Sequence, residues 1–246
     1  VAQVATAAVD SPAHQAAASR VLGVLAKRAR SDIHAGVRLA AVQALGERFG
    51  PEVLDVLVDR VRADGYAGVR LAAVQALSER FRDEPHVREL LRERARADGH
   101  ASVRLSAVQA LGGYVGDEEF RRVLVDCLRT DPDAEVTRTA AQVLMGRFGA
   151  TGHVRDLLIE RARDDTEPAA RRICVRILGD RLAADRGVRA LLIDRVRSDP
   201  DPGVLRVAAR ALLHWQPPDT GIVRDMLVSR ARVDSDAIVR RTALRI

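Results

Sequence analysis

The residues of this sequence that could carry out chemistry are scattered, and none of them forms a catalytic or metal-binding pattern. The chain has no Gly-rich phosphate loop, no HExxH zinc motif, no CxxC pair and no GxSxG motif of serine hydrolases. Its six histidines lie far apart. Two cysteines, Cys127 and Cys174, are too few for a disulfide framework and favour buried, reduced thiols. We therefore expect no catalytic residue, no metal site and no cofactor, and we predict that the chain is not an enzyme.

Arginine is the side chain whose distribution points to binding. Basic residues outnumber acidic residues by 40 to 34, and Lys27 is the only lysine. The excess is uneven, because residues 1–131 carry 19 basic and 18 acidic residues, whereas residues 132–246 carry 21 and 16. A guanidinium group binds carboxylates and phosphates through a planar fork of donors, so the positions of these arginines decide what they can bind.

These positions follow an internal repeat. The phrase VRLAAVQAL occurs at Val37–Leu45 and again at Val69–Leu77, VRLSAVQAL follows at Val103–Leu111, and eroded copies recur at intervals of 32 to 35 residues. A period of this length indicates one supersecondary unit copied in series, which buries its apolar face only by stacking on its neighbours. We expect a single solenoid domain over residues 1–246, from a longer protein. Its predicted boundaries are a partial unit at 1–17 and repeats at about 18–49, 50–82, 83–115, 116–149, 150–183, 184–218 and 219–246.

Each repeat contains two helical patterns. In the first, apolar residues recur at helical spacing, as in Val154, Leu157, Leu158 and Ala162. The second helix is the repeated phrase, and its predicted buried stripe in the first copy is Val37, Ala41, Ala44, Leu45 and Phe49. The first-helix segments are Glu52–Arg62, His86–Arg96, His153–Arg163, Gly187–Arg197 and Ile222–Arg232.

The joint between the two helices carries an Arg-x-Asp sequence in all seven repeats. An Asp ahead of a helix accepts hydrogen bonds from free backbone N–H groups, and an Arg at the end of the preceding helix complements its dipole. We interpret the pair as a structural ladder between neighbouring repeats, and His34 and His100 in the same joint as exposed loop residues. The aspartates of the joint are Asp32, Asp64, Asp98, Asp131, Asp165, Asp199 and Asp234.

The joint D-x(5)-R followed by V-R-x-A-A-x-x-A-L resembles a HEAT repeat of the short bacterial kind, related to those of phycobilisome lyases. The resemblance covers the chain from about residue 18 to its end, and Val1–Val9 resembles the second helix of a preceding unit. It implies an all-α fold, a right-handed α-solenoid of about seven helix pairs. More loosely, Asp83–Asp98 is similar to HEAT arrays attached to bacterial NACHT-type (STAND) NTPases, although those arrays often carry Trp where this chain has Phe81.

The positions that vary among the repeats carry the functional prediction. The second and sixth residues after the leading Val lie four apart, on one helix face, which in HEAT-like stacking would be concave. They are Leu and Gln in the first repeats and Arg in the later ones. These arginines could pair with neighbouring acids or an adjoining domain, or they could bind an anionic ligand. The candidate binding face comprises Arg138, Arg172, Arg176, Arg206, Arg210, Arg241 and Arg245.

The predicted function is a non-catalytic protein-interaction or ligand-sensing module of a larger signalling protein, of NACHT type if the looser resemblance holds. One alternative is an array that binds nucleic acid or another polyanion, although few aromatic residues are available for base stacking. A third is a regulatory or scaffold subunit for an enzyme. No segment is long and apolar enough to span a membrane, so we expect a cytoplasmic protein whose partner is a protein or an adjoining domain.

Overall fold

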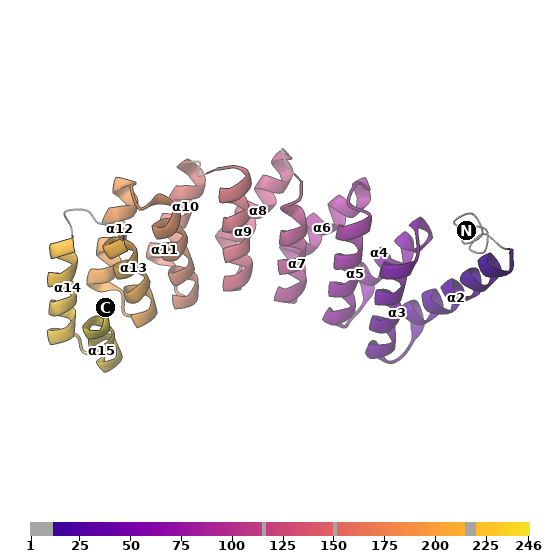
Figure 1. Ribbon diagram of the computed structural model, residues 1–246, viewed down its shortest axis with the longest axis horizontal. Coiled ribbons are helices and arrows are strands. Elements are labelled where there is room, and N and C mark those ends of the chain that lie inside the picture. Colours follow the sequence, from indigo (N-terminus) through magenta and orange to yellow (C-terminus); the bar gives the residue numbers. More distant parts are fainter. Residues whose placement is uncertain (1–11, 115–116, 150–151, 215–219) are drawn as a thin grey trace, which may run out of the picture. The chain divides into compact units, whose positions relative to one another are not determined.

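The computed structural model describes residues 12–114, 117–149, 152–214 and 220–246. Within these ranges the chain forms fourteen α-helices and one short 3-10 helix, with no strand (Figure 1). It divides into two compact units, Val1–Tyr114 and Val115–Ile246. The predicted helix at Val1–Val9 lies outside the described residues.

The first unit contains three helix pairs. The first helices are α2 (Pro12–Ser31), α4 (Leu54–Ala63) and α6 (Pro85–Ala97), and the 3-10 helix η1 (Pro51–Val53) leads into α4. The second helices, which carry the repeated phrase, are α3 (Ala35–Arg48), α5 (Ala67–Arg80) and α7 (Ala101–Leu111). Each second helix packs on its own first helix, and α5 also packs on α3 and α7.

The second unit contains four helix pairs in two rows (Figure 1). The first helices are α8 (Glu118–Thr130), α10 (Gly152–Asp164), α12 (Arg186–Ser198) and α14 (Thr220–Val233). The second helices are α9 (Ala134–Arg147), α11 (Pro168–Leu182), α13 (Pro202–His214) and α15 (Ala237–Arg245). Each helix contacts its pair partner and the next helix of its own row. The predicted all-α solenoid of about seven helix pairs is confirmed.

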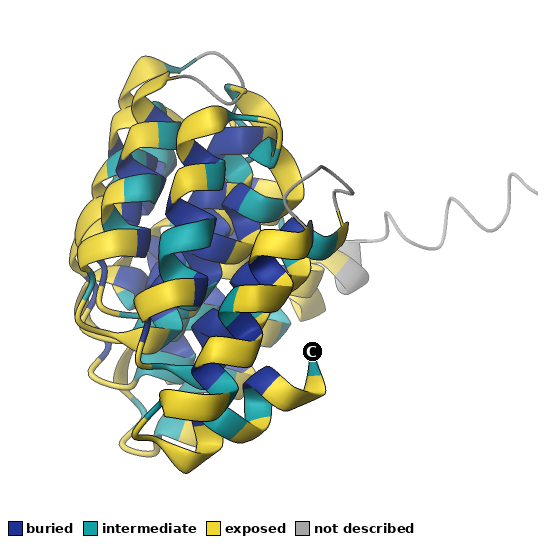
Figure 2. Cartoon of the chain, turned by 90° about the vertical axis from the view of Figure 1, so that its left-hand side faces the viewer, coloured by how far each residue is buried: buried dark blue, intermediate teal, exposed yellow. Residues whose placement is uncertain are grey.

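The core lies between the two rows of helices, where aliphatic side chains from both rows are buried (Figure 2). The predicted first-helix stripe is confirmed, because Val154, Leu157, Leu158 and Ala162 are all buried. The predicted second-helix stripe is only partly correct in its first copy. Ala41 and Leu45 are buried, but Val37 is 40% exposed. The equivalent Val69 of α5 is fully buried, because α3 packs against α5. Val37 lacks this cover, because no described second helix precedes α3.

Two glycines allow neighbouring second helices to approach closely. A Cβ on Gly46 of α3 would lie 2.7 Å from the Cβ of Ala76 in α5. At the equivalent position in the second unit, a Cβ on Gly179 of α11 would lie 2.6 Å from the Cβ of Ala211 in α13. At each of these crossings a glycine thus faces an alanine of the neighbouring second helix, and the two small residues permit the close approach.

The joints form a ladder between neighbouring repeats, but its arginine differs from the predicted one. Nε of Arg38 donates to Oδ2 of Asp64 at 2.7 Å, and Nη2 donates to Oδ1 at 2.9 Å. Arg70 binds Asp98 in the same bidentate manner, at 2.8 and 2.7 Å. The ladder arginine is thus the one that follows the leading Val of the second helix, whereas Arg62 of the Arg-x-Asp pair is exposed.

The joint aspartates also fix the local turn. In each of the seven joints, the Asp carboxylate accepts a hydrogen bond from the backbone N–H two residues later, as Asp64 does from Tyr66 at 2.9 Å. That later residue is the one that directly precedes the second helix, so the Asp orders the turn without capping the helix itself. His34 and His100 occupy this later position and are exposed, as predicted.

Candidate functional site

The predicted arginines all lie on the second helices of the second unit. Helix α9 carries Arg138, and each of the next three second helices carries two arginines four residues apart. The helices α11, α13 and α15 lie side by side, since α13 packs on both of the others. The pairs are Arg172 and Arg176 on α11, Arg206 and Arg210 on α13, and Arg241 and Arg245 on α15.

Five of the seven arginines surround two adjoining hollows. The larger hollow, of about 1000 Å³, is lined by Arg176, Arg210 and Arg245. The smaller, of about 330 Å³, is lined by Arg206, Arg210, Arg241 and Arg245. Arg210 and Arg245 line both, so the two hollows form one basic surface. We call the five residues the arginine face: Arg176, Arg206, Arg210, Arg241 and Arg245.

All five side chains of the arginine face are exposed, and within the described ranges none forms an ion pair or a side-chain hydrogen bond. Within the described residues, these five arginines therefore do not pair with neighbouring acids. Like charges brought this close repel one another, so an anion placed among them is attracted by several guanidinium groups at once.

Arg138 and Arg172 have different surroundings from the other five. Arg138 forms an ion pair with Glu135, three residues earlier on α9, and donates to Oε1 of Gln142 at 2.9 Å. Arg172 is half-buried and lies against the start of α13: a Cβ on Gly203 would be 3.1 Å from its Nη1. Arg138 is therefore engaged on its own helix, and Arg172 lies against Gly203 without lining either hollow.

Three polar residues of the larger hollow were missed from the sequence. Asp180 and Arg181 at the end of α11 and His214 at the end of α13 line it together with the arginines. The position of Asp180, four residues after Arg176, was the available signal, because it places both on one helix face. Asp180 introduces a negative charge at the α11 end of an otherwise basic hollow.

The remaining reactive groups lie away from this surface. Cys127 and Cys174 are buried free thiols, and burial raises the pKa of Cys174 to about 12. Among the described residues, no three His, Cys, Asp or Glu side chains gather in a way that would hold a metal ion. None of the described helices is both long and apolar enough to cross a membrane.

Taken together, the stacked helix pairs and the arginine face define a helical-repeat protein with an open basic surface. A family model described as HEAT repeats matches residues 2–78, 69–145 and 155–245. The chain therefore belongs to the HEAT-repeat family.

Comparisons with individual proteins support the fold. An X-ray structure of YibA from Escherichia coli is similar, with a TM-score of 0.56, 20% identity, and coverage of 92% of this chain and 82% of that chain. The human deoxyhypusine hydroxylase in complex with glycerol matches with a TM-score of 0.38, 18% identity, and coverage of 96% and 90%. At 20% identity, the similarity to YibA concerns the fold alone. The TM-score of 0.38 for the hydroxylase is too low to support a conclusion. No curated protein matches the sequence.

Proposed function

We propose that the chain is a non-catalytic interaction module that binds an acidic protein partner through the arginine face. The observation that carries this proposal is that the five guanidinium groups around the two hollows have no ionic partner among the described residues. Arginine without an internal partner is suited to bidentate recognition of carboxylates. Apolar residues between the arginines, such as Val207 and Leu213, favour a protein surface over a purely ionic ligand.

Binding to a nucleic acid is the second candidate, because phosphates would also be attracted to the arginine face. Among the described residues that line the two hollows, none is a Phe, Tyr or Trp, and the imidazole of His214 is the one aromatic ring on which a base could stack. This composition favours the acidic protein partner.

A charge-reversal experiment tests the proposal. The chain is titrated with fluorescein-labelled poly-glutamate and, separately, with a labelled DNA duplex, and binding is followed by fluorescence anisotropy at low and at physiological salt. We expect poly-glutamate to bind, with an affinity that falls as salt screens the charges, and the Arg206→Glu/Arg210→Glu variant to lose this binding. Binding of the duplex alone would show that the partner is a nucleic acid.

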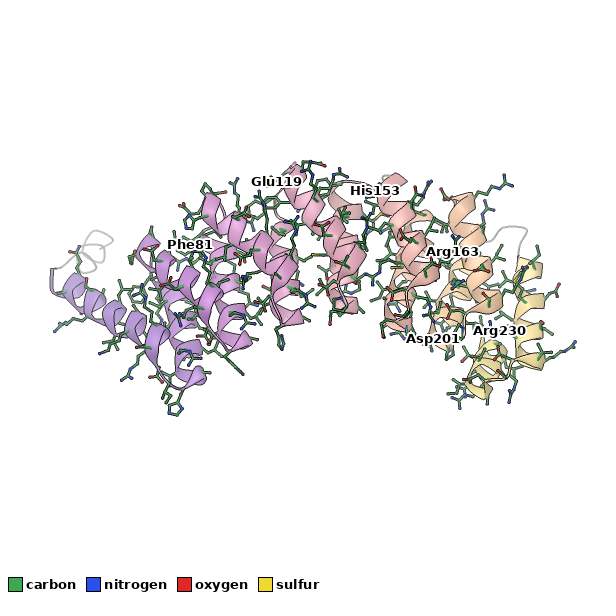
Figure 3. The ribbon with its side chains drawn as sticks, turned by 180° about the vertical axis from the view of Figure 1, so that it is seen from behind. Phe81, Glu119, His153, Arg163, Asp201 and Arg230 are labelled. Carbon is green, nitrogen blue, oxygen red and sulfur yellow. The ribbon has the colours of Figure 1, made fainter. Side chains whose placement is uncertain are left out.

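The matched control is Arg163→Glu/Arg197→Glu, which changes the net charge equally on the first helices α10 and α12. Arg163 (labelled in Figure 3) and Arg197 are exposed and do not line either hollow. Equal losses in both variants would mean that net charge, not the arginine face, governs binding.

We extend the proposal to the parent protein: the module is the sensing arm of a larger signalling protein, of NACHT type. The resemblance of Asp83–Asp98 to arrays of such proteins supports this. The complete reading frame tests it. A nucleotide-binding domain in the same frame agrees with the proposal, and a frame made only of repeats contradicts it.

A further inference from the structure

The arginine face repeats at a spacing set by the helices. Positions 210 and 245 are equivalent residues of α13 and α15, and position 176 is the equivalent residue of α11, so one arginine recurs on each helix along the row. Packed helices lie about 8–10 Å apart. The backbone positions of Arg176, Arg210 and Arg245 therefore recur about 8–10 Å apart along the row, and all three residues line the larger hollow.

A second row runs beside the first. Arg206 and Arg241 lie four residues before Arg210 and Arg245, which places their Cβ atoms about 5–6 Å away on the same helix faces. Both line the smaller hollow together with the later pair. Each carboxylate bound over α13 or α15 can thus meet two guanidinium groups, whereas over α11 it meets Arg176 beside the acidic Asp180.

This spacing matches one peptide conformation. A polyproline II helix has three residues per turn and rises about 3.1 Å per residue, so every third side chain returns to the same face after about 9 Å. A β-strand returns to the same face after two residues, or about 6.6 Å, which does not match the helix spacing. Acidic side chains at every third residue of a polyproline II segment would meet one helix each.

We propose that the arginine face binds an extended polyproline II segment with Asp or Glu at every third residue, lying across α11, α13 and α15. This inference rests on the proposed function and specifies the partner of the same surface. The larger hollow receives an apolar side chain of the segment, because its lining also includes Val207, Ala211 and Leu213.

Peptides of equal composition test the register. One carries three glutamates in the pattern Glu-Pro-Ala repeated three times, and the other carries the same residues with the three glutamates contiguous. Fluorescence anisotropy at low salt should show the spaced peptide binding about tenfold more tightly, because only it places one carboxylate over each helix. Equal affinities would overturn the proposed spacing of one acidic residue in every three, and would leave the proposal of an acidic protein partner standing. If neither peptide binds and the poly-glutamate and duplex titrations also fail, both proposals are overturned.

Two variants locate the segment on the surface. Arg210→Glu should weaken binding of the spaced peptide by about tenfold or more, because Arg210 lines both hollows, while Arg197→Glu should change it by less than about twofold. Asp180→Asn should tighten binding by about two- to fivefold, since it removes the one Asp or Glu among the described residues that line the larger hollow. An unchanged affinity in Asp180→Asn together with an unchanged affinity in Arg210→Glu would place the segment elsewhere.

Discussion

Arg171 of α11 holds Asp199, in the joint before α13, through two hydrogen bonds of 3.0 Å, from Nε to Oδ2 and from Nη2 to Oδ1. The side chain of Arg171 is 8% exposed and that of Asp199 is fully buried. Nη1 of Arg171 also donates to the carbonyl oxygen of Asp165, in its own joint, at 2.9 Å. One arginine therefore links two consecutive joints, which explains how stacked repeats keep a fixed register.

Removal of the Asp199 charge should destabilise the fold strongly. Asp199→Asn leaves the buried Arg171 without its counter-ion, and breaking a buried pair from one side costs about 3–5 kcal/mol. Denaturant unfolding followed by circular dichroism measures the loss. The matched control is Asp156→Asn, whose pair with Arg155 lies at the surface, and we expect little or no loss of stability there. Similar losses in the two variants would show that the ladder contributes no more than a surface ion pair.

Acid should lower the stability of the first unit, because it protonates the aspartates of the equivalent ladder pairs, Arg38–Asp64 and Arg70–Asp98. Burial of Asp64 opposes its ionisation, but hydrogen bonds from Arg38 and from the Tyr66 N–H outweigh this effect and lower the pKa of the carboxyl. Arg70 and the His100 N–H lower the pKa of Asp98 in the same way, again against the effect of burial. A folded-state pKa below the unfolded value of about 3.9 means that the stabilisation is complete above that pH. It is lost as the pH falls through the lower, folded-state pKa.

Unfolding curves recorded between about pH 6 and pH 2 measure this dependence. Asp64→Asn should be less stable than the wild type at neutral pH, and its stability should decrease less on acidification, because the titrating group is gone. A variant whose acid dependence equals that of the wild type would show that Asp64 does not contribute to it.

The sequence predicted the fold well because the fold depends on a local pattern. The period of the phrase that begins at Val37 reveals the helix pair, and the apolar spacing reveals which face is buried. The ladder was misassigned because its partners are joined across repeats: Asp64 follows Arg62 in sequence, yet it binds Arg38, 26 residues earlier. Sequence proximity does not show which of two arginines reaches a carboxylate in the neighbouring repeat.

The candidate site was predicted from two equivalent positions in each second helix, and the structure shows that the arginines at these positions have different surroundings. Helical spacing groups Arg206 with Arg210, and both residues line the smaller hollow. Helical spacing did not distinguish Arg138 from the other arginines, although its ion-pair partner Glu135 lies only three residues earlier in the sequence. The position of Arg172 against Gly203 depends on how α13 packs on α11, which the sequence of either helix alone does not contain.

Close packing of second helices should make one helical glycine sensitive to substitution. Gly179→Ala places a methyl group 2.6 Å from the Cβ of Ala211, so α11 and α13 must separate, with an expected loss of about 1–3 kcal/mol. Gly146 lies in the last turn of α9, and a methyl group added there would meet no described atom within 4 Å apart from its chain neighbours and the nearby backbone of its own helix. Gly146→Ala should leave the stability unchanged or raise it by up to about 1 kcal/mol. Thermal unfolding of both variants compares them, and a stabilised Gly179→Ala would contradict the close approach.

The buried thiols should resist alkylation in the folded protein. With a pKa of about 12, Cys174 holds almost no thiolate at neutral pH, and its burial also blocks reagents. Cys127 is buried as well. Mass spectrometry after treatment with iodoacetamide should find no label on native protein and both cysteines labelled in denaturant. Rapid labelling of Cys174 without denaturant would show that α11 opens readily.

Arg230 of α14 compensates for an interruption of the ladder. Leu205 of α13 stands where α11 has the ladder residue Arg171, so the joint at Asp234 receives no arginine from the preceding second helix. Instead, Arg230 donates to the carbonyl oxygens of Arg197 at 2.9 Å and Asp199 at 2.8 Å and contacts Asp234 at 2.6 Å. Arg230 is labelled in Figure 3, together with Asp201, which directly precedes α13.

Arg230→Met, which keeps the apolar stem, should therefore cost about 2–3 kcal/mol, because the buried carbonyl of Asp199 and the partly buried carbonyl of Arg197 lose a charged donor. Arg195 occupies the equivalent position one repeat earlier, where Arg171 still holds Asp199, so Arg195→Met should cost about 1 kcal/mol. Repeats contact only their neighbours, and the effect of Arg230→Met should be concentrated in α14 and α15. Hydrogen exchange by mass spectrometry detects this as faster exchange in these two helices, with α11 unchanged. Equal loss of protection in the two variants would show that Arg230 replaces nothing at this joint.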